Sequence, residues 1–281
     1  MNAPTTPVLF DRALLAQRQR RAARVPETFL LDRVIDDMTD RIAAVKRDFA
    51  DVADLWTPSG ALEAVLATHF RTFTRLTAPQ NGDEELAVTP QSLDLALSVL
   101  AFQFVNDLPG LLAQIRRSLR PDGFLLAAMI GGDTLTELRQ SFAAAEAECE
   151  AGVSPRVAPF ADLRDVGGLL QRAGFALPVT DVDRVVVRYA DVFGLMQDLR
   201  RMGATNVLVE RRRAPTRRAT MLRMAEIYGE RFADQDGRIR ATFDIIWLSG
   251  WAPHESQQKP LRPGSAKASL EEAVRAAKKN E

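Results

Sequence analysis

The sequence is poor in the side chains that build disulfide frameworks and metal centres. Among 281 residues there is one cysteine, Cys149, and there are two histidines, His69 and His254. One cysteine excludes an intramolecular disulfide framework and a cysteine-based zinc site, and two histidines exclude a multi-histidine metal site. His254 could serve as a general base beside Glu255, but neighbouring residues of an extended segment point in opposite directions. A purely structural role for His254 is the competing interpretation.

The sequence also lacks an excess of either charge and lacks long apolar runs. Lysine plus arginine and aspartate plus glutamate both number 37, so the net charge is zero and no overall field favours nucleic acid. No apolar run approaches the roughly 18 residues that suggest a membrane-spanning helix. These absences predict a soluble chain with no transmembrane segment. The basic run 211–218 has no interleaved aromatics, which favours a solvated or partner-docking surface over an RNA platform.

Glycine is scarce where the fold would most use it, in the stretch 49–60. An apolar run ends at Asp54, and a helix follows a short turn. In an α/β domain, this junction opens the crevice where nucleotide-type ligands bind, and glycines let the ligand approach the backbone. Here the turn contains Trp56 and Pro58, and only Gly60 is a glycine. An acid followed by a helix-start glycine fits a nucleoside cofactor with a charged amino-acid group, but an ordinary strand–helix turn would look the same.

An acid is also missing after the next predicted strand. Dinucleotide and related sites place a carboxylate there to accept hydrogen bonds from both ribose hydroxyls. Residues 69–81 contain no acid, and Arg75 and Thr77 stand at the expected place. This absence speaks against ordinary ribose binding. Asp83 and Glu84 follow in a loop that could flank an adenine ring, although paired loop acids are more often simply solvated.

What is present is an alternation of strand and helix patterns. Segments with helical periodicity or capping signals separate apolar or alternating segments typical of strands. The predicted strands are 50–55, 69–76, 93–100, 124–130, 177–189 and 239–248. This alternation predicts a doubly wound, mostly parallel sheet. At the start of the helix after residue 131, Thr134 and Glu137 have the spacing of a capping box.

The chain shows no compelling domain boundary, so we predict a single domain over residues 1–281. Within it we expect an N-terminal helical segment at 10–45 and a helical insertion at 191–237. The proline-containing stretch that follows the last strand predicts a C-terminal arm at 250–281, ending in a short polar helix at 270–279.

A set of distinctive motifs runs along the chain: F-D-R (10–12), F-V-N-D-L-P (104–109), L-R-P-D-G-F (119–124), G-G-D-T-L-T-E-L-R (131–139), S-P-R-V-A-P-F (154–160), L-L-Q-R-A-G-F (169–175), L-M-Q-D-L-R-R-M-G-A-T-N (195–206), G-W-A-P-H-E-S-Q-Q-K-P (250–260) and P-G-S-A (263–266). With these motifs the chain resembles the methyltransferase-type assembly factors of respiratory complex I, within the S-adenosylmethionine-dependent methyltransferase superfamily. The resemblance spans nearly the whole chain, and L-R-P-D-G is shared across the superfamily.

The resemblance implies a seven-stranded Rossmann-like sheet with helices on both faces and S-adenosylmethionine at its carboxyl edge. It assigns Asp54, Gly60, Asp83 and Glu84 to cofactor binding. The family's D-L-G-x-G-x-G motif corresponds to residues 54–60, where Trp56 and Pro58 replace the first two glycines. No catalytic residue is assigned, because catalysis in this superfamily is mostly positioning and desolvation of an electrophilic methyl group.

Two functional hypotheses follow from the resemblance. The first is a methyltransferase-like enzyme that modifies or assists a protein subunit during complex I assembly; the family also includes a member described as hydroxylating an arginine of such a subunit. The second is a scaffold on the same fold that has lost the cofactor and holds a subunit through its arm and its basic surface. Because F-D-R begins only ten residues into the chain, the sequence predicts a bacterial-type cytoplasmic protein, placed peripherally near the inner membrane.

Overall fold

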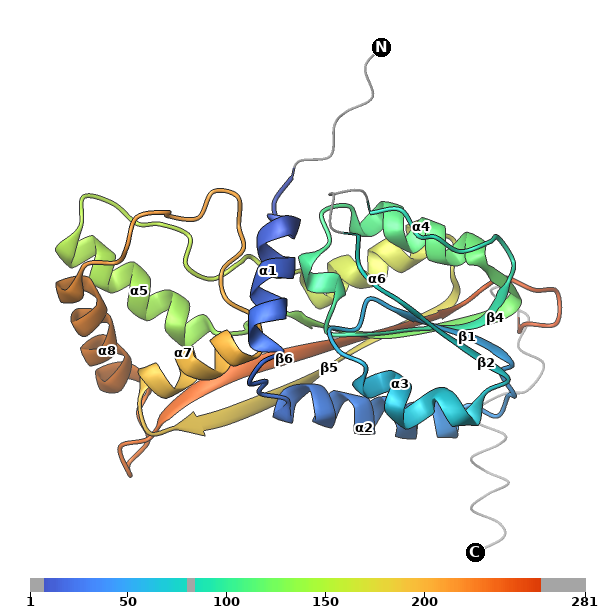
Figure 1. The fold of residues 1–281 in the computed structure, drawn as a ribbon, viewed down its shortest axis with the longest axis horizontal. Coiled ribbons are helices and arrows are strands. Elements are labelled where there is room, and N and C mark those ends of the chain that lie inside the picture. The colour runs from blue at the N-terminus through green and yellow to red at the C-terminus, as the bar shows by residue number, and fades with distance from the viewer. Residues whose placement is uncertain (1–7, 80–83, 259–281) are drawn as a thin grey trace, which may run out of the picture.

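The computed structural model, which describes residues 8–79 and 84–258, is built on one central sheet (Figure 1). Its strands are β1 (Asp51–Leu55), β2 (Thr72–Leu76), β3 (Leu93–Val99), β4 (Leu119–Gly131), β5 (Ala176–Tyr189) and β6 (Ile239–Trp251). They lie in the order β2-β1-β3-β4-β6-β5. The first four are mutually parallel, and β6 runs antiparallel to both β4 and β5. All six predicted segments form strands, and the described residues contain one strand fewer than the seven that the resemblance implies.

Eight α-helices surround this sheet in the described part of the chain. They are α1 (Arg12–Ala22), α2 (Phe29–Ala44), α3 (Ala61–Leu66), α4 (Leu108–Ser118), α5 (Thr136–Cys149), α6 (Leu163–Arg172), α7 (Val192–Arg201) and α8 (Arg218–Phe232). Four of them begin after an aspartate whose side chain accepts a hydrogen bond from a first-turn amide, which satisfies otherwise unpaired donors. These caps are Asp11, Asp107, Asp162 and Asp191.

Helices cover both faces of the sheet, which confirms the predicted α/β class. In Figure 1, α4 and α6 lie on one face of β1, β3 and β4, and α2 and α3 lie on the other. The side chains of β3 alternate accordingly: Leu95 and Leu97 enter the core shared with α2 and α3, whereas Ala96 enters the core shared with α4 and α6. Because both faces are buried, the strand reads as a nearly continuous apolar run.

The capping box predicted at Thr134 and Glu137 is wrong. The cap position of α5 is Leu135, in a left-handed conformation, and no side chain caps the helix. Thr134 instead accepts a hydrogen bond from the amide of Asp244, and Glu137 accepts bonds from the amide and hydroxyl of Thr242. Both side chains therefore tie the start of α5 to β6, a tertiary use that local spacing does not reveal.

The single-domain organisation and its segment boundaries stay predictions. The segment 191–237 contains α7 and α8, and 10–45 contains α1 and α2. The predicted arm 250–281 starts inside β6, which runs to Trp251. Everything after residue 258, including the predicted helix at 270–279, lies outside the described residues.

The close approach of Gly132 to β6 yields a stability prediction. Gly132 has a φ of +55°, and an added Cβ would lie 2.7 Å from Oδ2 of Asp244. Left-handed backbone alone disfavours alanine by about 1–2 kcal/mol, so we expect Gly132→Ala to lower the free energy of unfolding by at least that amount in chemical denaturation. Gly168→Ala, on α6 with no atom within 4 Å of the added Cβ, is the control and should stabilise by about 0.5–1 kcal/mol. Equal effects of the two substitutions would contradict this account.

Candidate functional site

The crevice lies where the chain reverses direction across the sheet. From β1 the chain passes to β2 on one side and then to β3 on the other, which makes the carboxyl ends of β1 and β3 a topological switch point, the usual ligand site of such sheets. Asp54 lies close to the end of β1, in register with Arg75 of β2 and Leu97 of β3. The structure therefore brings the predicted acid and the arginine of the next strand side by side.

Asp54 is fully buried and only half satisfied. Its Oδ1 accepts hydrogen bonds from the amide and the hydroxyl of Thr57, whereas Oδ2 has no partner among the described residues. Burial raises the pKa of Asp54 to about 6, and the Thr57 hydrogen bonds and the charge of Arg75 oppose that rise only in part. A buried carboxylate oxygen without a hydrogen bond lowers the stability of the folded protein. Oδ2 of Asp54 is therefore available to a polar group of a ligand.

Trp56 fills the crevice next to Asp54. Its backbone is left-handed, with a φ of +69°, a conformation that suits glycine and strains a bulky residue. Trp56 as a residue is 5% exposed, and it belongs to the same buried cluster as Leu86 and Phe102. The guanidinium of Arg12 lies over the ring, 5.8 Å from its centroid. The turn thus keeps a backbone shape suited to glycine while a large side chain occupies the space beside it.

Two hydroxyl side chains hold this turn against β3, and sequence reasoning missed both. Thr57 accepts a hydrogen bond from the amide of Val99 at 3.1 Å, and Ser98 donates to the carbonyl of Leu55 at 2.8 Å. Ser98 is the only polar residue in the apolar run 95–100, and this isolated position could have indicated a buried hydrogen bond. A buried hydroxyl needs a partner, and here the partner is the end of β1.

The other residues predicted to bind the cofactor are Gly60, Glu84 and Asp83, and the structure does not show them as a cluster around Asp54. Gly60 precedes the six-residue α3 with a φ of −80°, so its conformation does not require glycine. Both carboxylate oxygens of Glu84 accept backbone hydrogen bonds, from the amides of Asn106 at 2.8 Å and Asp107 at 2.7 Å. Glu84 is therefore already used to anchor the segment before α4. Asp83 lies outside the described residues.

These residues fit one end of S-adenosylmethionine and not the other. The free Oδ2 of Asp54 could accept from the ammonium group of the amino-acid end. The ribose end would meet Arg75 near the end of β2, where a carboxylate would be required, and Nε of Arg75 is itself buried with no hydrogen-bond partner in the part of the chain that the structure describes. The indole of Trp56 takes up the crevice beside it. As the side chains stand, the crevice does not fit the nucleoside half of the cofactor.

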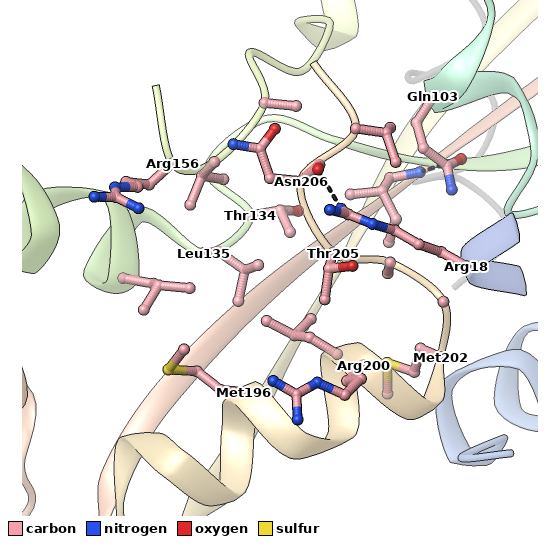
Figure 2. Close-up of a pocket in the computed structure, with 18 of the residues that line it drawn as sticks. Arg18, Gln103, Thr134, Leu135, Arg156, Met196, Arg200, Met202, Thr205 and Asn206 are labelled. Carbon is pink, nitrogen blue, oxygen red and sulfur yellow. Dashed lines mark hydrogen bonds between the residues drawn. The ribbon is translucent and has the colours of Figure 1, made fainter. Parts of the chain in front are cut away.

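A separate cavity of about 430 Å³ opens beside the crevice. Pro58 borders it, together with Leu100 and Gln103, which follow the carboxyl end of β3. Most of the remaining lining comes from α1, α2, α5, α7, α8, β4, β6 and the segments 156–160 and 203–216. Figure 2 shows Arg18, Arg156 and Arg200 around this space. The volume lies within the roughly 300–1,000 Å³ of small-ligand pockets.

The remaining candidate residues lie elsewhere or are engaged. His254 is exposed and follows the end of β6 that pairs with the start of β4, which places it at the opposite edge of the sheet from the crevice. Its imidazole pairs with the hydroxyl of Ser256 at 2.7 Å. Within residues 8–79 and 84–258, no cluster of three or more metal-ligating side chains is found.

Comparison with known proteins supports the methyltransferase architecture. A family model described as a methyltransferase domain matches residues 62–127. The human arginine-hydroxylase NDUFAF5, mitochondrial, is 37% identical over 96% of this chain and 84% of its own length. The chain belongs to the NDUFAF5 family. This result confirms the resemblance to methyltransferase-type assembly factors of complex I.

More distant proteins share parts of the chain or the fold alone. A malonyl-[acyl-carrier protein] O-methyltransferase of Laribacter hongkongensis is 38% identical over 69% of this chain and 63% of its own length. The crystal structure of a putative methyltransferase from Bacillus halodurans superposes with a TM-score of 0.52 at 13% identity, covering 78% of this chain and 99% of that one. This likeness shows the Rossmann-like fold.

The comparison corrects the predicted cytoplasmic location, which is wrong. The NDUFAF5 proteins of human, rat and Dictyostelium discoideum are all named as mitochondrial. The early position of F-D-R was therefore no guide to compartment. As to the predicted lack of a transmembrane segment, none of the described helices is long and apolar enough to cross a bilayer.

The environment of Asp54 predicts a pH-dependent stability. Its folded pKa of about 6 lies above the ordinary 3.8, so its contribution to stability is fully present below pH 3.8 and is lost as the pH rises through 6. The loss amounts to about 3 kcal/mol, since each pKa unit corresponds to about 1.4 kcal/mol. Asp54→Asn should remove this dependence.

Chemical denaturation of both proteins between pH 4 and pH 8 measures the effect. Asp54→Asn keeps an oxygen for the Thr57 hydrogen bonds, so we expect the stability of the native protein to fall relative to the variant as the pH rises. Parallel pH profiles for the two proteins would show that Asp54 does not titrate in this range.

Proposed function

We propose that this protein is a methyltransferase-like factor that modifies or assists a protein subunit during assembly of respiratory complex I. The observation that carries the proposal is the near full-length correspondence with NDUFAF5, which spans the sheet, the crevice and the walls of the cavity. NDUFAF5 is named as an arginine hydroxylase, which supports a protein side chain as the target class for this chain as well. The comparisons do not favour the alternative of a cofactor-free scaffold.

We further propose that S-adenosylmethionine binds this crevice only when Trp56 leaves it. The free oxygen of Asp54 supports a site for the amino-acid end of the cofactor, and the packed indole opposes the nucleoside end. A cofactor that must first displace a buried aromatic binds more weakly by the free energy of that displacement. The native chain is therefore expected to bind S-adenosylmethionine poorly.

The assembly role is tested by deleting the gene in its source organism. We expect less assembled complex I on native gels and lower rotenone-sensitive NADH oxidation in membranes, both restored by the gene supplied in trans. An unaltered amount of fully active complex I in the deletion strain would overturn the proposed function.

The role of Trp56 is tested by calorimetric titration with S-adenosylmethionine. Trp56→Gly removes the indole at a position whose φ of +69° suits glycine, so we expect affinity at least about tenfold higher than in the native protein, or 1.4 kcal/mol. Trp56→Phe keeps a ring in the crevice and is the matched control, for which no such gain is expected. Circular dichroism confirms that each variant is folded. Tight binding by the native protein, unchanged by Trp56→Gly, would show that the indole does not block the cofactor.

A further inference from the structure

Two of the sequence motifs, F-D-R (10–12) and F-V-N-D-L-P (104–109), contact each other beside the crevice. The rings of Phe10 and Phe104 lie edge to face, with their centroids 6.0 Å apart. Both residues pack in a small apolar cluster that also contains Leu208. The structure thus joins two motifs that lie far apart in the sequence and that the proposed function does not explain.

Asn106 fastens the first of these motifs to the second. The segment concerned, residues 9–12, is called the strap. Oδ1 of Asn106 accepts hydrogen bonds from the amides of Leu9 and Phe10, both at 2.8 Å, and Nδ2 donates to the carbonyl of Phe10 at 3.3 Å. On its other side the strap hydrogen-bonds to the segment 207–209. One side chain therefore supplies hydrogen bonds that a neighbouring strand would otherwise make.

Arg12 carries the contact between the strap and the crevice. Its guanidinium lies over the ring of Trp56, 5.8 Å from the centroid, and its Nη1 donates to the carbonyl of Phe104 at 3.0 Å. Arg12 is buried, and burial lowers its pKa because the loss of water disfavours the charged form. A cation within about 6 Å of an indole face is attracted to the ring. Arg12 therefore stabilises Trp56 in the crevice.

Glu84 links this guanidinium to the segment before α4. Its carboxylate, which accepts hydrogen bonds from the amides of Asn106 and Asp107, lies 4.0 Å from Nε of Arg12. Within residues 8–79 and 84–258, no other carboxylate lies as close to Arg12. A buried ion pair is costly to break, because the remaining charge is left without its partner. Glu84 therefore favours the arrangement in which Arg12 covers the indole.

We propose that the strap is an autoinhibitory latch on the crevice, in which Arg12 is the positioning residue that keeps Trp56 in place and Asn106 fastens the strap. This inference rests on the proposed binding of S-adenosylmethionine after Trp56 leaves the crevice. Trp56 is enclosed on all but 5% of its surface, so it can leave only when a neighbour moves. Leu86 and Phe102 belong to the same core cluster as Trp56, whereas Arg12 belongs to the strap.

The latch gives the crevice two states. In the closed state, which the structure shows, the strap is fastened and Trp56 is packed. In the open state the strap is released and the indole leaves the crevice. A ligand that binds only the open state has an apparent affinity reduced by the fraction of protein in that state. Substitutions that release the strap should therefore expose Trp56 and strengthen cofactor binding.

The position of Trp56 is measured by acrylamide quenching of tryptophan fluorescence in the full chain without cofactor. The contribution of Trp56 is the difference between each protein and the same protein carrying Trp56→Phe. We expect Trp56 to be shielded in the native protein and to become accessible in Arg12→Met, which removes the charge and keeps an unbranched apolar side chain. Asn106→Ala should act in the same way. Arg12→Lys should restore part of the shielding, because it retains a cation without the planar guanidinium.

Gln257→Ala is the matched control for Asn106→Ala. The side chain of Gln257 also makes three hydrogen bonds, to Asp122, to the carbonyl of Ala252 and from the amide of His254. It follows the end of β6 that pairs with the start of β4, at the opposite edge of the sheet from the crevice. We expect this substitution to leave the shielding of Trp56 unchanged. Circular dichroism confirms that each variant is folded.

Calorimetric titration with S-adenosylmethionine then tests whether Arg12 acts through the indole. We expect Arg12→Met to raise the affinity roughly tenfold, because it raises the fraction of protein in the open state. In the Trp56→Gly background the same substitution should add nothing, because the ring that Arg12 holds is gone.

Two results would overturn the latch. The first is a Trp56 that stays shielded in folded Arg12→Met and Asn106→Ala, and the second is an equal gain in affinity from Arg12→Met with and without Trp56→Gly. The quenching experiment contains no cofactor, so it separates the latch from the proposed function. Exposure of Trp56 in both variants, with no binding of S-adenosylmethionine by any variant including Trp56→Gly, would support the latch and overturn the proposed cofactor binding.

Discussion

The packing of one indole against the carboxyl end of β1 determines what the rest of this site can do. Trp56 has a left-handed backbone and is almost completely buried, a strained arrangement that persists only when its surroundings hold it in place. The turn is held by Thr57 and Ser98 through hydrogen bonds to and from β1 and β3, and Arg12 covers the ring. The crevice is therefore filled by the protein itself.

This packing leaves buried polar groups beside the indole without partners. Among the described residues, neither Oδ2 of Asp54 nor Nε of Arg75 has a hydrogen-bond partner, and the two residues lie in register on neighbouring strands. Protein interiors rarely keep such groups unless function or strain retains them. Together with the family relationship, they support the proposed site for the amino-acid end of S-adenosylmethionine, whose nucleoside end the packed indole opposes. The adjoining cavity remains open.

The periodicity of apolar residues predicted the strands of the sheet correctly, but it did not predict the side-chain contacts between distant parts of the sequence. The six strands were readable because burial on one or both faces imposes an apolar run or an alternation, as in β3 and β5. The glycine replacements and the missing ribose acid were visible directly in the sequence. The use of Thr134 and Glu137 to bind β6, and of Glu84 to hold the segment before α4, was not visible, because their partners lie far away in the sequence. The cytoplasmic location was also predicted wrongly, because the distance of a motif from the N-terminus does not indicate the cellular compartment.

The central claim is that Trp56 occupies the cofactor crevice of the native protein. The most direct measurement is ¹⁹F NMR of the protein labelled with 5-fluorotryptophan. The chain has three tryptophans, and the resonance that disappears in Trp56→Phe is that of Trp56. The account predicts that the Trp56 resonance shows a buried environment and does not shift when S-adenosylmethionine is added in large excess over the protein. A shift of that resonance that saturates at low micromolar S-adenosylmethionine would contradict it.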